Sequence, residues 1–149
     1  MNNLISIKKV SRSYSNNKKV TVLKKINYSF ARGKIYSIMG PSGSGKSTLL
    51  NILSMIDKPT TGSMLIGSDI IDFNNNTDND KIRAKKIGII YQQNNLLPDF
   101  TALENVYLAG LALTDDKKNS IQKAKKIIKK MGLSTRERHY PSELSGGEM

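Results

Sequence analysis

The chain has 149 residues, enough for one domain with a buried core, and it carries a formal net charge of +12 at pH 7. Its lysines are spread along the chain without interleaved aromatic residues, so we expect a solvated basic surface and no specific nucleic-acid partner. It has no cysteine and no apolar run near the roughly 20 residues that cross a bilayer, which excludes disulfides, thiolate catalysis, cysteine-based metal sites and a membrane-spanning helix.

Two strands are the first elements expected, at residues 4–10 and 20–30, where apolar residues partly alternate with polar ones. A polar turn at Ser15–Lys19 separates them, so the pair is predicted to form a β-hairpin. Gly33 then marks a turn into the apolar run 35–39, which predicts a buried strand.

The segment after this strand combines a loop pattern with a helix. Residues Gly40 to Ser47 match the pattern G-x-x-x-x-G-K-[ST] of a phosphate-binding loop. The residues that follow predict a helix at 46–56, which Lys58–Gly62 ends. The alternative is a glycine-rich turn that happens to contain a lysine, but a strand before the loop and a helix after it favour a nucleotide site.

The chemistry of such a loop follows from its residue types. Glycines allow backbone conformations that side chains block, so amides can converge on phosphate oxygens at the start of the helix. Lys46 supplies a positive charge for the β- and γ-phosphates, and the Ser47 hydroxyl is placed to bind Mg²⁺. The predicted nucleotide-binding residues of the loop are Gly40, Pro41, Ser42, Gly43, Ser44, Gly45, Lys46, Ser47 and Thr48.

The middle of the chain alternates short elements and polar stretches. Residues 63–66 predict a short strand, residues 74–79 a polar loop and residues 78–86 a short helix. The run 87–91 is apolar and rich in β-branched residues, and it predicts a second buried strand. This run and the run 35–39 are apolar enough to need neighbours on both sides in a parallel sheet.

The second part of the chain has a helical pattern. Thr101 and Glu104 predict a capping box at the start of a helix that extends to about Leu113. Residues 116–131 predict a second helix, with one apolar face, lysines opposite and Gly132 as its C-cap. This face could lie on a membrane, but it is narrow and lacks Trp and Phe, so packing on the neighbouring helix is favoured.

The chain closes with the motif Leu144–Glu148, in which Ser-Gly-Gly alone would predict only a flexible turn. Because it follows a phosphate-binding loop, the motif resembles the signature of ATP-binding-cassette (ABC) ATPases, and the resemblance covers essentially the whole chain. It implies an α/β fold, an incomplete P-loop ABC ATPase core with an antiparallel β subdomain and an α-helical subdomain. Residues 1–92 would form the nucleotide-binding core with the β subdomain, and residues 93–149 the helical subdomain that ends in the signature.

The same resemblance implies further site residues. Gln92 matches the glutamine that approaches Mg²⁺ and the attacking water, with Gln93 as its adjacent competitor. Tyr14 is similar to the aromatic residue that stacks on adenine, although it could also be an ordinary tyrosine at the end of a strand. The implied catalytic residues are Lys46, Gln92 and Ser145, the implied Mg²⁺ ligands are Ser47 and Gln92, and the residues implied to bind ATP outside the loop are Tyr14, Gly146 and Gly147.

The stretches Tyr91–Gln92, Leu96–Val106 and Tyr140–Leu144 are similar to the ATPase subunit of lipoprotein-releasing systems. This implies ATP hydrolysis that drives lipoprotein release from the inner membrane. The enzyme would be a homodimer with two ATP molecules and Mg²⁺ between its copies, bound to integral membrane subunits. Since the N-terminus lacks the apolar stretch of a secretory signal, we expect a peripheral protein on the cytoplasmic face.

Several alternatives remain at this stage. The chain could belong to a macrolide-export or cell-division ABC complex, or be a non-catalytic truncated module for nucleotide binding or assembly. A cytosolic ABC ATPase of DNA repair or translation is disfavoured by the short spacing of the motifs and by Leu96–Val106. A P-loop kinase is disfavoured by the signature at Leu144–Glu148.

The family's Walker B strand, with an Asp that organises Mg²⁺ and a general-base Glu, follows the signature, and a switch histidine lies further on. We expect a chain cut after the signature, which binds nucleotide weakly at best and does not hydrolyse it alone. Asp57, Asp69 and Asp72 lie in the wrong context for the Walker B acid. His139 precedes the signature and is expected to be a surface histidine.

Overall fold

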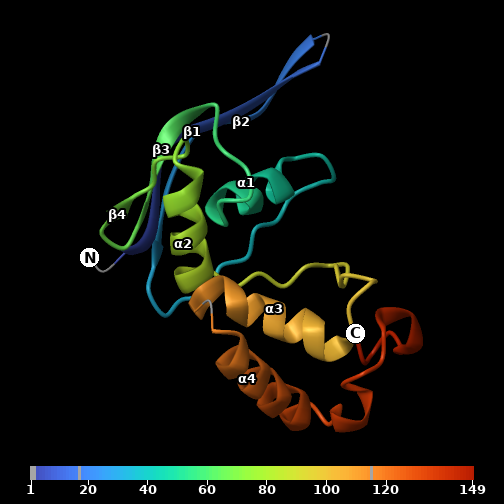
Figure 1. Ribbon diagram of the computed structural model, residues 1–149. Helices are drawn as coiled ribbons and strands as arrows, with labels where there is room; N and C mark the ends of the chain where they lie inside the picture. Colours follow the sequence, from blue (N-terminus) through green and yellow to red (C-terminus); the bar gives the residue numbers. More distant parts are fainter. Residues whose placement is uncertain (1–2, 17, 115) are drawn as a thin grey trace. The chain divides into compact units, whose positions relative to one another are not determined.

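The computed structural model describes residues 3–16, 18–114 and 116–149 (Figure 1). Its helices and strands fall into two units, Met1–Ile87 and Gly88–Met149. The boundary predicted from the sequence lies a few residues later, after residue 92. The assignment of a nucleotide-binding core and a helical subdomain to the two parts stays a prediction.

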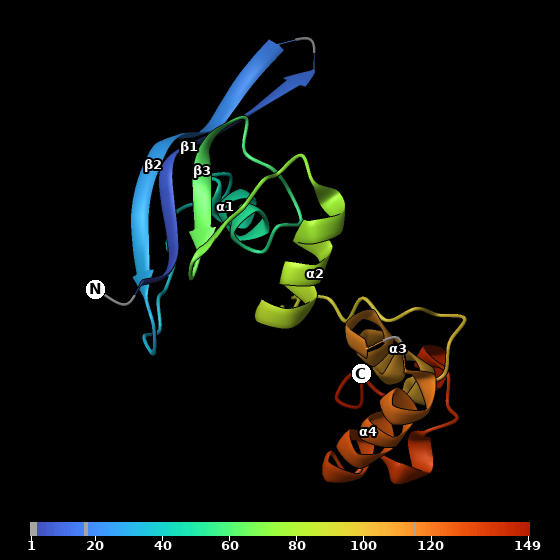
Figure 2. The same cartoon turned by 60° about the vertical axis from the view of Figure 1, so that its left-hand side comes forward.

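The first unit is built on an antiparallel sheet with the strand order β2–β1–β3–β4; Figure 2 shows the first three strands side by side, and Figure 1 shows β4 beyond β3. β1 (Asn3–Asn16) and β2 (Lys18–Ala31) form a long hairpin, β3 (Thr61–Ile66) pairs with β1, and β4 (Asp69–Ile70) pairs with β3. The predicted hairpin and the predicted strand at 63–66 are confirmed.

The turn expected at Ser15–Lys19 is wrong in extent. The ladder between β1 and β2 continues through the pairs Ser15 with Lys19 and Asn16 with Lys18, so these residues belong to strands. Their backbone hydrogen bonds extend the hairpin beyond its apolar part. Asn17, at the centre of the expected turn, lies outside the described residues.

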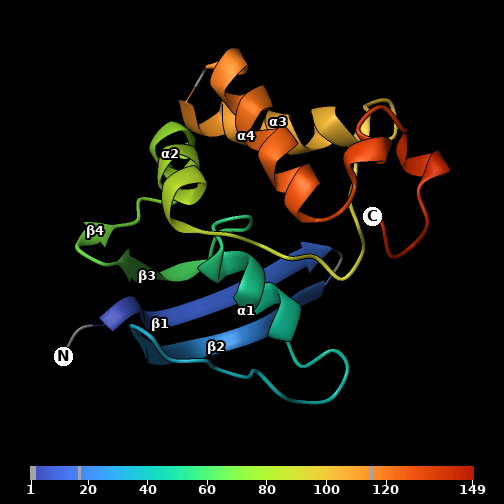
Figure 3. The ribbon, with the colours of Figure 1, turned by 90° about the horizontal axis from the view of Figure 1, so that it is seen from below.

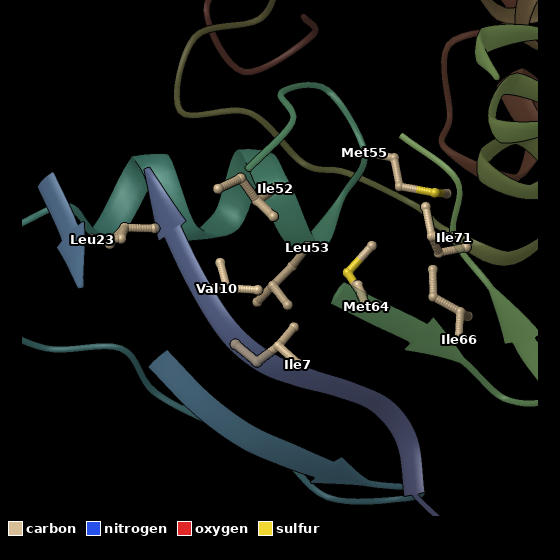
Figure 4. Packing of buried hydrophobic residues seen from close by; sticks show 9 residues of the cluster. All are labelled: Ile7, Val10, Leu23, Ile52, Leu53, Met55, Met64, Ile66 and Ile71. Atoms are coloured by element: carbon tan, nitrogen blue, oxygen red, sulfur yellow. The ribbon is translucent and has the colours of Figure 1, made fainter. Parts of the chain in front are cut away.

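A hydrophobic core lies between the sheet and the helix α1 (Lys46–Leu53), which crosses one face of the sheet (Figure 3). The helix ends before the predicted position 56, because Met55 has a φ of +57°, which a helix cannot accommodate. Figure 4 shows how the buried side chains of the strands and of α1 point toward one another. The buried cluster comprises Ile7, Val10, Leu23, Ile52, Leu53, Met55, Met64, Ile66 and Ile71.

Helix α2 (Asn76–Lys86) begins earlier than the sequence indicated, so the predicted polar loop at 74–79 is largely helical. The cause is a cap, because the side chain of Asn75 accepts a hydrogen bond of 3.2 Å from the amide of Asp78. On the other side, Arg83 donates to the carbonyl of Met55 at 3.0 Å. This bond ties α2 to the segment that follows α1.

The predicted buried strands at 35–39 and 87–91 are not formed. Both segments have irregular backbone and pair with no strand of the described residues. Ile35 and Ile90 are fully exposed, at 101% and 100%. The β-branched sequences favour strands, but a strand also requires a partner for its backbone amides and carbonyls.

The second unit consists of α3 (Ala102–Thr114), α4 (Lys117–Lys130) and two short 3₁₀ helices, η1 (Ser134–Arg136) and η2 (Pro141–Glu143). The predicted capping box is confirmed, because the amide of Thr101 donates to Glu104 at 2.8 Å and the amide of Glu104 donates to the Thr101 hydroxyl at 3.3 Å.

Helix α4 packs on α3 through its apolar face, which confirms the packing that the sequence favoured. Ala124 and Ile128 are buried, whereas Ile127 and Met131, at the edge of this face, are exposed. The helix ends at the predicted C-cap. Gly132 has a φ of +76°, and the amide after it donates to the carbonyl of Ile128 at 3.0 Å.

Candidate functional site

The loop that leads into α1 is shaped by glycines with positive φ. Gly40, Gly43 and Gly45 have φ values of +153°, +76° and +91°, and Gly45 is the N-cap of the helix. The first turn of α1 contains no acidic residue, and no side chain in the described part of the protein caps it. Because the first amides of a helix lack intrahelical partners and carry partial positive charge, this end of α1 suits an anion.

Gly45 is required by packing as well as by its backbone conformation. A Cβ atom at this position would lie 2.9 Å from Cγ1 of Val22 and 3.0 Å from Cδ2 of Leu23. Both contacts are closer than real Cβ atoms tolerate without movement of a neighbour. The loop therefore rests directly on β2, and the sheet fixes the place where the helix begins.

Lys46 folds back over the loop. Its ammonium group donates to the carbonyl oxygens of Gly40 at 2.9 Å and of Pro41 at 2.8 Å. The loop is closed by a further bond of 3.3 Å from the amide of Ser44 to the Pro41 carbonyl. The ammonium group and the exposed Ser47 thus lie with the helix amides in one short segment. The segment includes every loop residue that the sequence singled out, namely Gly40, Pro41, Ser42, Gly43, Ser44, Gly45, Lys46, Ser47 and Thr48.

Tyr14 lies on β1 opposite Val20, close along the ladder to the residues of β2 that contact Gly45. The residue is 41% exposed, and its hydroxyl donates to Oδ2 of Asp57 at 3.1 Å. The guanidinium carbon of Arg12 lies over the ring, 4.5 Å from the centroid. Neither the contact of Asp57 with Tyr14 nor the place of Arg12 is predictable from the sequence, because no spacing in it connects β1 with the end of α1.

The other predicted site residues belong to the second unit, which is described by itself. Gln92 and Gln93 are exposed and lie in irregular backbone. Ser145, Gly146 and Gly147 form a turn, in which the amide of Glu148 donates to the Ser145 carbonyl at 2.9 Å. The roles of these residues stay predictions.

Glu148 fixes the signature turn. Its carboxylate accepts hydrogen bonds from the Ser145 amide at 2.8 Å and from Nε of Arg136 at 2.9 Å. The bond from the Ser145 amide, and after it the bond from Arg136, lower the pKa of Glu148 from 4.5 to about 2. Sequence reasoning missed Arg136 as well. His139 is partly exposed, and its backbone carbonyl accepts a bond of 2.8 Å from the amide of Ala102.

The lowered pKa of Glu148 predicts an acid-sensitive turn. A carboxylate whose pKa is depressed on folding contributes stability above its ordinary pKa of 4.5, and this stability is lost as the pH falls toward about 2. We expect the amide of Ser145 to lose protection from hydrogen exchange over this range. Glu148→Gln should abolish the pH dependence, whereas Glu137→Gln should preserve it. An unchanged acid transition in Glu148→Gln would contradict the assignment.

Among the described residues, no helix is long and apolar enough to cross a membrane. The same part of the chain contains no cluster of three or more His, Cys, Asp or Glu side chains that could hold a metal ion. The exposed hydroxyl of Ser47 is an oxygen donor of the kind that Mg²⁺ prefers.

Residues 23–149 match the family described as ABC transporter, and the chain belongs to that family. The chain is similar to "Lipoprotein-releasing system ATP-binding protein LolD" of Rickettsia bellii (strain RML369-C), with 41% identity over 99% of this chain and 65% of the relative. The protein of the same name from Francisella tularensis subsp. holarctica (strain OSU18) is 43% identical over 97% of this chain and 64% of the relative. The chain thus spans less than two thirds of the length of these relatives.

The solved structures to which the chain is similar are also ATP-binding cassettes. The ATP-binding cassette MJ0796, described as a dimeric post-hydrolysis state bound to ADP and Pi, has a TM-score of 0.84 and 37% identity over 97% of this chain and 64% of that chain. A second dimeric structure of MJ0796, described as a bacterial ABC transporter cassette, has a TM-score of 0.83 and 38% identity. These similarities confirm the predicted family and the predicted fold class.

Proposed function

We propose that the chain is the nucleotide-binding portion of an ABC transporter ATPase that uses ATP hydrolysis to release lipoproteins from the inner membrane. The observation that carries the nucleotide role is the loop Gly40–Gly45, which ends at an uncapped helix start with the ammonium of Lys46 folded over it. The names of the relatives support lipoprotein release as the process that is driven.

The proposal assigns a role to the backbone of the loop and to four side chains. The amides at the start of α1 bind phosphate oxygens, and Lys46 leaves its two carbonyl partners to neutralise the β- and γ-phosphates. Mg²⁺ would supply additional positive charge to the same phosphates, with Ser47 and Gln92 as its protein ligands. Tyr14 stacks on adenine, a contact that works through the π-face of the ring.

We further propose that two copies of the protein enclose the nucleotides. The signature turn of one copy, with Ser145, Gly146 and Gly147, would donate to the γ-phosphate held by the loop of the other. Glu148 and Arg136 support this role because they hold the Ser145 turn in one conformation. The dimeric state of the solved relatives supports the same arrangement. Integral membrane subunits would receive the motion, with this protein peripheral on the cytoplasmic face.

Replacement of Lys46 tests the nucleotide role directly. Lys46→Ala is expected to lower the affinity for Mg-ATP by about 10- to 100-fold, because hydrogen bonds to charged groups contribute more than neutral ones. Isothermal titration calorimetry on the full chain measures this change. Lys85→Ala, which removes an exposed lysine of α2, is the matched control and should bind like wild type. Equal binding by Lys46→Ala, or no binding by folded wild type, would contradict the proposal.

The transport role requires a cellular readout. Cells in which Lys46→Ala replaces the wild-type residue should retain lipoproteins in the inner membrane, as fractionation of the membranes would show. A normal distribution of lipoproteins, despite a proven loss of ATP binding, would argue against lipoprotein release. The proposed nucleotide-binding role would not be affected by that result.

A further inference from the structure

Three side chains of the first unit meet where the segment after α1 is bonded to β1. Asp57 accepts a hydrogen bond of 2.7 Å from Nη2 of Arg12 through Oδ1, and one of 3.1 Å from the Tyr14 hydroxyl through Oδ2. Arg12 in turn lies over the Tyr14 ring. Each member of this group, which we call the Tyr14 clamp, thus contacts both of the others.

The carboxylate of the clamp is fixed to the end of α1. The amide of Asp57 donates to the carbonyl of Asn51 at 3.1 Å, and the Asp57 carboxylate also accepts a bond of 2.8 Å from the amide of Lys58. The start of the same helix carries the loop that holds Lys46. Because a helix is a rigid spacer, the position of the Asp57 carboxylate is set relative to that loop.

The strand side of the clamp is equally constrained. The amide of Thr60 donates to the carbonyl of Ser11 at 2.8 Å, and the Thr60 hydroxyl accepts a bond of 2.9 Å from the amide of Ser13. Arg12 and Tyr14 follow these residues on β1 and share one face of the strand. The segment after α1 is therefore bonded to β1 on both sides of Arg12, and the second of these bonds directly precedes Tyr14.

Arg12 occupies one face of the tyrosine ring. Its side chain is only 19% exposed, and its Nε atom is buried without a hydrogen-bond partner among the described residues. A buried N–H without a partner is unfavourable, so the guanidinium is held by the ring and by Asp57 rather than by complete hydrogen bonding. A base can stack only on the opposite face of the ring.

We propose that Asp57 and Arg12 are positioning residues, which hold the Tyr14 ring at a fixed place relative to the phosphate-binding loop and leave one ring face for the nucleotide base. The inference rests on the proposed function, in which Tyr14 stacks on adenine. It adds to that function a connection between the base and the phosphates through α1. A ring held in advance loses less conformational freedom when the base stacks on it.

The test compares two probes, Mg-ATP and Mg-tripolyphosphate, of which the second has no base. Asp57→Asn keeps the size of the side chain but removes its charge, and should lower the affinity for ATP about fivefold, a part of what loss of stacking costs. The affinity for tripolyphosphate should not change. Asp80→Asn, which breaks an ion pair with Arg83 on α2, is the matched control and should leave both affinities unchanged.

Two further variants separate positioning from folding. Tyr14→Phe keeps the ring and removes only the bond to Asp57, so it should lower the affinity for ATP about twofold and leave the affinity for tripolyphosphate unchanged. Tyr14→Ala should lower the affinity for ATP about tenfold, and the double variant with Asp57→Asn should lose no more affinity than Tyr14→Ala alone. Calorimetry of the full chain measures all of these affinities.

The outcomes divide clearly. Loss of ATP affinity alone in Asp57→Asn and Tyr14→Phe, absent from the Asp80→Asn control, supports the clamp. If Tyr14→Ala lowers the affinity for ATP while these two variants do not, the clamp is wrong and the proposed function stands. The same conclusion follows if Asp57→Asn lowers the affinities for ATP and tripolyphosphate equally. If Tyr14→Ala leaves ATP affinity unchanged, the adenine role of Tyr14 fails, and the clamp fails with it.

Discussion

Replacing Gly62 with alanine is expected to destabilise the first unit by about 2–5 kcal/mol, the sum of backbone strain and overpacking. Gly62 has a φ of +102°, which side chains disfavour. An added Cβ would lie 2.6 Å from the carbonyl oxygen of Lys9 and 2.6 Å from Cα of Val10. Both atoms belong to the backbone of β1 and cannot turn aside as a side chain could.

The measurement is the free energy of unfolding from urea titration, with hydrogen exchange of the β1 and β3 amides to locate the loss. Gly67→Ala is the matched control, because Gly67 also has a positive φ, +62°, but an added Cβ there meets nothing within 4 Å. This control should lose only the strain, about 1–2 kcal/mol. A loss in Gly62→Ala no larger than in Gly67→Ala would show that β1 yields to the added atom.

Features that depend on neighbours in the sequence were predicted well. The hairpin joins strands that are neighbours in the sequence, and the capping box of Thr101 and Glu104 arises within a single turn, where residue type and spacing determine the hydrogen bonds. The C-cap at Gly132 is of the same kind. In each case the local chemistry has one favoured arrangement, so the sequence alone is enough to find it.

Features that depend on distant residues were not predicted. The runs 35–39 and 87–91 have strand-like composition, yet Ile35 and Ile90 are exposed because no described strand pairs with these runs. The contact of Asp57 with Arg12 and Tyr14 also joins segments far apart in the chain. No periodicity encodes such a contact, since it exists only after the segment behind α1 has paired with β1.

The core that joins α1 to the sheet gives the second large prediction. Ile52 is fully buried, at 0% exposure, and belongs to the same cluster as the sheet residues Val10 and Met64, which are also at 0% (Figure 4). Ile52→Ala should lower the free energy of unfolding by about 2–5 kcal/mol, because the cavity adds to the lost transfer free energy. Ile52→Val should cost about 0.5–1.5 kcal/mol, since it removes a single methyl group.

Leu50 offers the matched control on the same helix, since its side chain is 53% exposed and Leu50→Ala should change the free energy of unfolding by less than about 1 kcal/mol. Mg-ATP should stabilise wild type and the Ile52 variants by the same increment, if the variants weaken the core but leave the loop at Gly45 and Lys46 in place. Equal losses in Ile52→Ala and Leu50→Ala would mean that α1 is not held by this core. The phosphate-binding loop would then need another support, because α1 is the element that carries it.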